Sequence, residues 1–150
     1  VEPLVGIERG MTAPDFALND SDGNEVHLSS FRDQQKPVLF YAMATWCPYC
    51  AQDFKALSNV YQNYEQDVSF VVMSLDLSED APTLAKYKER YPKLQSIPFA
   101  PGKSSILADY QITKTTTKYA LDKNGVIIYK GSGAFSEEQW QTLLDALRDS

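Results

Sequence analysis

Apolar residues gather in short runs separated by polar, turn-forming segments, and the spacing within each run predicts its element. The runs at 37–44 and 68–75 are almost continuously apolar, as expected of strands covered on both faces of a sheet. Between them, large apolar residues recur at helical spacing from Phe54 to Tyr64. The first half of the chain therefore predicts a strand–helix–strand unit.

The N-terminal part of the chain predicts a small antiparallel hairpin. Residues 13–18 and 25–28 read as short strands, joined by the turn-forming sequence Ser-Asp-Gly-Asn at 21–24. A single helical turn follows, for which we expect a cap from one of the two serines at 29–30. Ahead of the hairpin, we expect residues 1–10 to form a flexible segment.

The second half of the chain predicts two helices, a hairpin and a final helix. The two helices are expected at 80–91 and 104–110, separated by a proline-rich loop at 91–102. A hairpin is indicated at 118–130, around the turn Asp-Lys-Asn-Gly. The last helix opens on a capping box that begins at Ser136, and an apolar stripe follows it.

This order of elements predicts a single α/β domain over residues 1–150, with a central mixed sheet flanked by helices. The composition agrees, because 43% hydrophobic and 12% aromatic residues suffice for a core and exclude a disordered chain. Fourteen basic and twenty acidic residues give a net charge of −6, which argues against a nucleic-acid surface. No stretch approaches the roughly 18 apolar residues of a membrane-spanning helix, so we expect no integral membrane segment.

The candidate chemistry is concentrated in the only two cysteines of the sequence, Cys47 and Cys50. Two cysteines placed at random in such a chain would lie three positions apart in roughly one case in a hundred. A zinc site needs about four ligands, and the single histidine, His27, leaves the chain short of them. We therefore expect no metal site within the chain and no cofactor. A redox-active pair is the leading interpretation, and two small buried hydrophobes are the structural alternative.

The position of the pair also favours redox chemistry. Cys47 follows an apolar strand and precedes Pro48, a preferred first residue of a helix. Its sulfur is thus expected beside unpaired backbone N–H groups, where the helix dipole favours a thiolate. Cys50 lies one turn further on and is expected to point inward. We assign Cys47 as the nucleophile and Cys50 as the cysteine that resolves the mixed disulfide.

Asp53 lies a further helical turn along, within reach of the pair. Two interpretations stay open. Asp53 could be an ordinary solvated carboxylate, or it could accept and return a proton for Cys50. In the second case its negative charge would also raise the pKa of nearby thiols.

Three segments follow one another in a familiar order: Ala-Pro-Asp-Phe at 13–16, Ala-Thr-Trp-Cys-Pro-Tyr-Cys at 44–50 and Tyr-Ala-Leu-Asp-Lys-Asn-Gly at 119–125. The chain that carries them resembles the thioredoxin superfamily, and within it the TlpA/ResA-like thiol–disulfide oxidoreductases, which are related to the AhpC/TSA redoxins. The first segment is shared with peroxiredoxins. The resemblance implies a thioredoxin-like fold with an N-terminal β-hairpin extension, in which Cys47 is the exposed nucleophile and Cys50 the buried resolving cysteine.

The resemblance also implies an enzyme that exchanges electrons between its two cysteines and those of partner proteins. The implied partners are protein disulfides or dithiols, apocytochromes among them, and an upstream redox protein. Such proteins are usually exported and often tethered, so we expect an extracytoplasmic monomer whose tether is absent from this chain; a cytoplasmic location is the alternative. Asp53 matches a position where ResA-like members often carry a glutamate credited with proton handling.

Two positions depart from the family pattern. Tyr41 stands six residues before Cys47, where thioredoxins carry a buried aspartate. Thr116 stands where this fold nearly always has a cis-proline, so we predict a trans Thr115–Thr116 bond or a strained cis one. The Thr116 hydroxyl is then expected near Cys47. The residues expected to bind substrate are Trp46, Pro48, Tyr49, Thr115 and Thr116.

Two other functions stay open at this point. A peroxiredoxin-like thiol peroxidase would need Thr or Ser three residues before its reactive cysteine, but Ala44 holds that place before Cys47. A metal or iron–sulfur carrier would take Cys47 and Cys50 from each of two chains. That function gains from the loss of the proline at Thr116.

Overall fold

Strand β3 (Val38–Met43) lies at the centre of the fold, and all six of its residues are buried, as its continuous apolar run predicts. In the computed structural model, which describes residues 3–150, β3 pairs in parallel with β4 (Ser69–Ser74). On its other side it pairs antiparallel with β6 (Thr117–Leu121). The strand that leads into the cysteine pair is therefore held on both edges.

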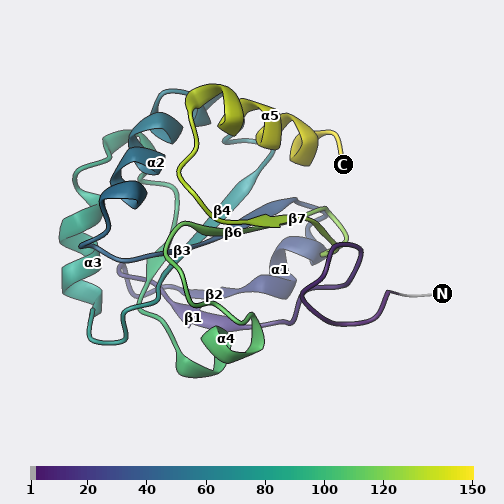
Figure 1. Cartoon of the computed structure of the whole chain (residues 1–150), viewed down its shortest axis with the longest axis horizontal. Coiled ribbons are helices and arrows are strands. Elements are labelled where there is room, and N and C mark those ends of the chain that lie inside the picture. The colour runs from purple at the N-terminus through teal and green to yellow at the C-terminus, as the bar shows by residue number, and fades with distance from the viewer. Residues whose placement is uncertain (1–2) are drawn as a thin grey trace.

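Two outer strands complete a mixed five-stranded sheet in the order β5–β4–β3–β6–β7. Strand β5 (Phe99–Ala100) runs parallel to β4, and β7 (Ile127–Gly131) forms the predicted hairpin with β6. Strands β1 (Ala17–Asn19) and β2 (Glu25–His27) form a separate antiparallel pair. Figure 1 shows this pair beside the main sheet, which confirms the predicted mixed sheet with an N-terminal hairpin.

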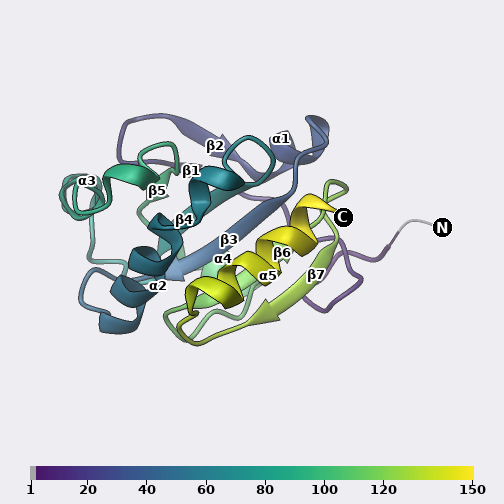
Figure 2. The same ribbon diagram turned by 90° about the horizontal axis from the view of Figure 1, so that it is seen from above.

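The pleat of β3 divides its side chains between two hydrophobic cores, because successive residues of a strand point to opposite faces. Leu39, Tyr41 and Met43 face the larger core, which contains both cysteines. Figure 2 shows the helices that cover this face. They are α2 (Pro48–Ser58), α3 (Ala81–Lys88) and α5 (Glu137–Arg148).

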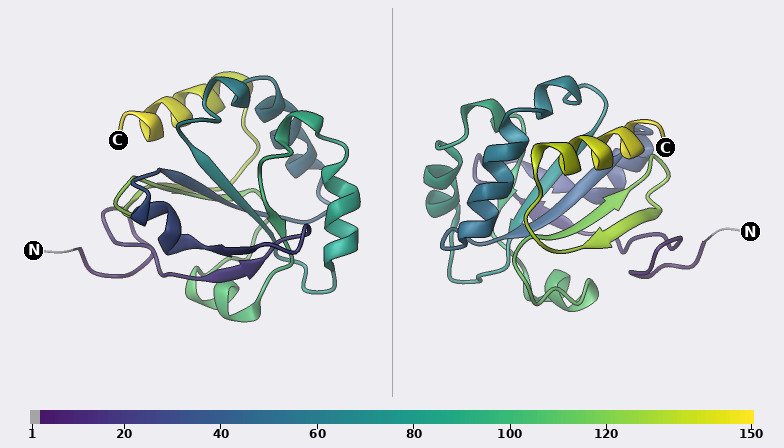
Figure 3. Two further views of the ribbon diagram at one scale, coloured as in Figure 1. Left: turned by 180° about the vertical axis from the view of Figure 1, so that it is seen from behind. Right: turned by 45° about the horizontal axis from the view of Figure 1, so that its top comes forward.

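The alternate residues Val38, Phe40 and Ala42 face a second core on the other side of the sheet. The two views of Figure 3 show the elements that lie there. They are α1 (Leu28–Asp33), α4 (Ser104–Asp109) and the β1–β2 pair. Over residues 3–150, no helix combines the length and the apolar character needed to cross a bilayer.

The helix after the cysteines is shorter than its apolar spacing predicts. Helix α2 ends at Ser58, because the N–H groups of Asn59 and Val60 bond to carbonyls only three residues back. A single 3₁₀ turn follows at Tyr61–Asn63. Since 3₁₀ spacing also brings residues three apart onto one side, Tyr61 stays buried against the same core.

Helix α1 is not capped by either serine at 29–30, contrary to expectation. Its N-cap is His27, whose side chain makes no capping hydrogen bond. Instead, the Asp15 carboxylate accepts a bond from the N–H of Ser29 at 2.9 Å. A residue from before the hairpin thus supplies the cap, which local sequence could not show. The predicted capping box at Ser136 is confirmed.

The N-terminal segment makes backbone contacts with the domain. The N–H of Gly6 donates to the carbonyl of Thr12 at 2.9 Å, and that of Gly10 donates to Ile127 at 2.8 Å. Leu4 and Val5 are nevertheless largely exposed. Flexibility of this segment stays a prediction, and residues 1–2 lie outside the described part of the chain.

Buried tyrosines lead to a prediction about alkaline stability. Burial is the largest cause that raises the pKa of Tyr41, Tyr61, Tyr87 and Tyr110 above the ordinary value. Above about pH 10 the unfolded chain loses these protons while the folded chain keeps them, so stability must fall as pH rises. Urea unfolding should show a lower free energy of unfolding at about pH 11 than at about pH 9.

The matched control is Tyr49→Phe, because Tyr49 is 61% exposed. It should leave the alkaline loss unchanged, whereas Tyr61→Phe should reduce it. The buried Lys118 works in the opposite direction, since burial lowers its pKa, but it is one group against four. An unfolding free energy that is flat across this range would contradict the prediction.

Candidate active site

Cys47 occupies the N-cap of α2, as its place between a strand and Pro48 predicts. Its sulfur accepts a hydrogen bond from the backbone N–H of Cys50 at 3.1 Å. It also contacts the hydroxyl oxygen of Thr115 at 3.2 Å. The sulfur therefore lies against the free N–H groups of the first helical turn, where the helix dipole stabilises a thiolate.

Cys47 is less accessible than the family resemblance implies. Its exposed fraction is 3%, against 0% for Cys50, and both are free thiols. The side chain is covered because its sulfur turns back over the helix end and meets the Thr115 loop. The exposed side chains are instead those of its neighbours, Trp46 at 62% and Tyr49 at 61%.

The loop opposite Cys47 differs from expectation in which threonine reaches the sulfur. The Thr115–Thr116 bond is trans, which is the first of the two predicted alternatives, and Thr116 has a left-handed backbone with φ of 65°. Its hydroxyl donates to the Thr115 carbonyl and accepts from the N–H of Gly133 at 2.8 Å. Because this conformation directs Thr116 toward Gly133, the hydroxyl that contacts Cys47 is that of Thr115.

Asp53 is completely buried and is not a solvated carboxylate. One of its oxygens, Oδ2, accepts from the Tyr41 hydroxyl at 2.5 Å and from Lys118 Nζ at 2.9 Å. The other oxygen accepts from the N–H of Phe135 at 2.6 Å. The tyrosine that replaces the usual buried aspartate is therefore a direct partner of Asp53.

Lys118 is the residue of this buried cluster that sequence reasoning missed. It is 0% exposed, and its register partner across the sheet is Tyr41. Its ammonium also donates to the carbonyls of Thr116 at 3.0 Å and Gly133 at 2.6 Å. Gly133 has φ of 109°, where a side chain would be strained. A lysine inside an otherwise buried strand was the available signal.

These contacts connect the acid–base groups to the second cysteine. Burial is the largest cause that raises the pKa of Cys50, to about 12, and a hydrogen bond with Tyr41 lowers it in part. Burial raises the pKa of Tyr41 far above its ordinary value. The Tyr41 hydroxyl that donates to Asp53 therefore also acts on the Cys50 thiol.

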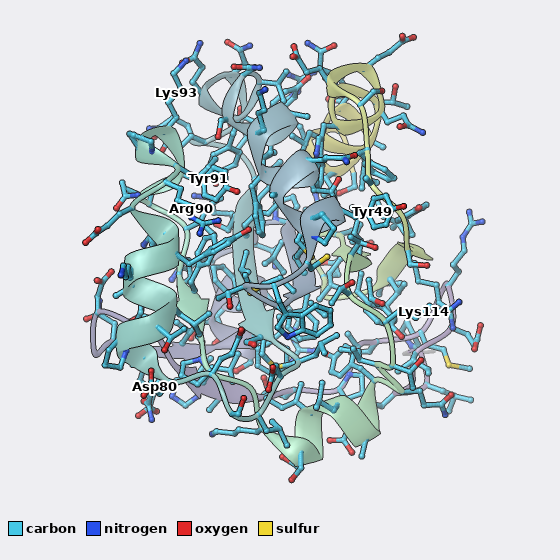
Figure 4. The ribbon with its side chains drawn as sticks, turned by 60° about the vertical axis from the view of Figure 1, so that its left-hand side comes forward. Tyr49, Asp80, Arg90, Tyr91, Lys93 and Lys114 are labelled. Carbon is cyan, nitrogen blue, oxygen red and sulfur yellow. The ribbon has the colours of Figure 1, made fainter. Side chains whose placement is uncertain are left out.

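Other predicted site residues form the exposed border of the pair. The Trp46 indole N–H donates to Asp76 at 2.9 Å, which fixes the ring at the surface. Figure 4 shows Tyr49 at the start of α2 and Lys114 on the loop that leads to β6. Pro48, which immediately precedes Tyr49, is also exposed. The surface next to the buried cysteines therefore includes two exposed aromatic rings.

The described residues, 3–150, contain no group of three or more His, Cys, Asp or Glu side chains placed to hold a metal ion. Cys47 and Cys50 would supply two ligands from one chain. The two free thiols lie close together, an arrangement that suits thiol–disulfide exchange.

Comparison with known proteins places this site in a family context. The model of the AhpC/TSA family matches residues 10–130. The thioredoxin-like protein YneN of Bacillus subtilis is 30% identical over 142 residues, covering 94% of this chain and 81% of that protein. The thiol-disulfide oxidoreductase ResA of Geobacillus kaustophilus is 26% identical over 139 residues, covering 93% of this chain and 78% of that protein.

Solved structures show the same fold. A thiol:disulfide interchange protein of the thioredoxin family from Chlorobium tepidum superposes with a TM-score of 0.81 at 19% identity. The match covers 94% of this chain and 98% of that one. The architecture built around β3 is therefore that of a thioredoxin fold.

The contact between Thr115 and Cys47 leads to a prediction about redox potential. In the thiolate state the Thr115 hydroxyl can donate to the sulfur and stabilise the reduced form, so Thr115→Val should remove about 1 kcal/mol of that stabilisation. The potential should then become about 20 mV more negative, measured from equilibrium with glutathione. Thr117→Val is the control, because its hydroxyl donates to the Lys114 carbonyl. An equal shift in both variants would count against this role.

Proposed function

This chain belongs to the AhpC/TSA family and is a TlpA/ResA-like thiol–disulfide oxidoreductase of the thioredoxin superfamily, and from that we propose that it exchanges electrons with the cysteines of partner proteins. The observation that carries the proposal is the unequal placement of two free thiols. Cys47 caps a helix beside its N–H groups, and Cys50 lies behind it, within hydrogen-bond reach of Tyr41.

The reaction divides between the two sulfurs. The Cys47 thiolate attacks a partner disulfide, which forms a mixed disulfide and releases one partner sulfur as a thiolate. Cys50 then loses its proton and attacks the Cys47 sulfur, so the Cys47–Cys50 disulfide closes and the second partner sulfur leaves. Two electrons pass from this chain to the partner, and the reverse sequence oxidises a partner dithiol.

Asp53 accepts the proton of Cys50 in this scheme. It is the carboxylate nearest to the resolving cysteine in the sequence, and its Oδ2 contacts the hydroxyl that hydrogen-bonds Cys50. The proton of Cys50 moves onto the Tyr41 oxygen while the phenol proton moves onto Asp53. Tyr41 never becomes a phenolate in this relay, which agrees with its raised pKa.

The partner docks on the surface around Cys47. Exposed Trp46 and Tyr49 supply large apolar contacts at low entropic cost, as aromatic residues do at protein interfaces. Pro48 and the Thr115–Thr116 loop complete the predicted substrate-binding set. Because Cys47 itself is buried, the partner disulfide must enter between the Trp46 and Tyr49 rings and this loop to reach the Cys47 sulfur.

The family indicates which classes of protein react at this site. They are protein disulfides or dithiols outside the cytoplasm, apocytochromes in cytochrome c maturation among them, and an upstream redox protein that resets the pair. The chain acts as a monomer that needs one copy of the site. Relatives named ResA and the thiol:disulfide interchange protein support this class of partner.

The roles of the two cysteines give a direct test. Cys47→Ser should abolish reduction of a protein disulfide, because no attacking thiolate remains. Cys50→Ser should still attack and should accumulate a mixed disulfide at Cys47, visible as an adduct by mass spectrometry. Equal turnover in Cys47→Ser would refute its assignment. Stoichiometric thiol loss with peroxide would support a peroxidase instead, and bound iron or zinc after anaerobic purification a metal carrier.

The docking surface gives a second test. Trp46→Ala and Tyr49→Ala should each raise KM for a protein disulfide about tenfold, as loss of an interface anchor does. Reduction of a small aromatic disulfide should change little, because it makes few of these contacts. Leu4→Ala is the matched control, since Leu4 is 77% exposed and belongs to the N-terminal segment. Unchanged KM in both ring variants would exclude this docking surface.

A further inference from the structure

Lys118 has no part in the reaction as described so far, yet it is the most deeply enclosed cation of the site. Its side chain is 0% exposed. It lies over three aromatic rings, at 4.3 Å from the centroid of Phe135, 5.1 Å from Tyr41 and 5.4 Å from Trp140. An ammonium held between ring faces is stabilised as a cation. The fold therefore keeps a positive charge where it could have placed an apolar side chain.

The backbone supports that charge independently of Asp53. The carbonyls of Thr116 and Gly133 accept from Nζ at 3.0 and 2.6 Å, so two of its three donors bind neutral acceptors. Only the third is paired with a carboxylate, at 2.9 Å. The ammonium can thus remain in place and charged when Asp53 takes up a proton.

Two buried groups beside Lys118, Asp53 and Cys50, can each carry a negative charge that pairs with its ammonium. The titratable groups that face it are Tyr41 from β3 and Cys47, Cys50 and Asp53 from α2. The segment between β7 and α5 supplies a ring and a carbonyl instead. Interaction with Asp53 opposes the lowering of the Lys118 pKa by burial, and negative charge on Cys50 and then on Cys47 acts in the same direction.

We propose that Lys118 is a positioning residue, the fixed counter-charge of the redox site, which pairs with the Asp53 carboxylate while Cys50 is a thiol and with the Cys50 thiolate once Asp53 holds the proton. This inference rests on the proposed function of Asp53 as proton acceptor. The relay then moves a negative charge from Asp53 to Cys50 without changing the net charge of the buried site.

The Lys118 ammonium also accounts for the release of the proton from Asp53. When Cys50 attacks and the disulfide closes, Cys50 becomes neutral and Lys118 loses that anion. Asp53 is then the one group in contact that can balance the ammonium, so it ionises again and gives up its proton. That proton neutralises one of the two partner thiolates through solvent, which completes the balance.

The test measures ionisation of Cys50 in a Cys47→Ser background, where it is the only thiol, from the ultraviolet absorbance of the thiolate against pH. Adding Asp53→Asn should raise the ionisation constant of Cys50 at least about tenfold, because Lys118 is left with Cys50 as its anion. Adding Lys118→Met to that variant should reverse the change. An Asp53→Asn effect of equal size with Lys or Met at position 118 would overturn the proposal.

A second readout covers the case in which Asp53→Asn does not fold at neutral pH, since an unpaired buried cation is strongly destabilising. Folding should then return at a lower pH than in Asp53→Asn/Cys50→Ser, because the Cys50 thiolate pairs with Lys118, whereas loss of the Lys118 proton would restore both variants alike. Circular dichroism would follow it, with the Asp53→Asn/Lys118→Met variant as the folded control. Failure of Asp53→Asn to fold at any pH, while that control folds, would also overturn the proposal.

These outcomes are separate from those that test the proposed function. The ionisation of Cys50 is measured without turnover or partner. A chain that reduces no disulfide could still show the charge exchange, and an active oxidoreductase could lack it.

Discussion

The contact between Asp53 on α2 and Lys118 on β6 is the constraint on which the site depends. Both side chains are completely buried, and removing a charge of either sign from water costs several kcal/mol unless it is paired and hydrogen-bonded. Asp53 therefore meets three donors and Lys118 three acceptors. The pair joins the helix that carries the cysteines to the strand that follows the Thr115–Thr116 loop, so the groups around Cys47 are held by one network.

The network separates the tasks of the two sulfurs. Cys47 needs only the end of a helix, which its N-cap position supplies. Cys50 lies in an apolar core, where burial raises its pKa to about 12, so the proposed reaction gives it a neighbour that takes its proton. In the proposed relay, Tyr41 provides that connection from the position where thioredoxins carry a buried aspartate. A hydroxyl there passes a proton on without adding a second negative charge to the core.

The fold and the position of the cysteines could be read from the sequence because they depend on local periodicity and helix-start signals. The continuous run of β3, the hairpin turn and the capping box at Ser136 are local patterns. The Asp15 cap of α1, the Lys118 pair and the choice of Thr115 over Thr116 are not, because each joins residues far apart in the chain. A lone lysine in β6 indicates a buried charge only when the carboxylate across the core is known.

The N-cap bond from Cys50 N–H to the Cys47 sulfur couples helix stability to oxidation state. A thiolate accepts this bond more strongly than a disulfide sulfur, so closing the disulfide weakens the start of α2. By thermodynamic linkage, any change that stabilises the first turn of α2 in this way also stabilises the dithiol relative to the disulfide, by the same coupling free energy. The folding free energy of the first turn of α2 therefore contributes directly to the reduction potential of the Cys47–Cys50 pair.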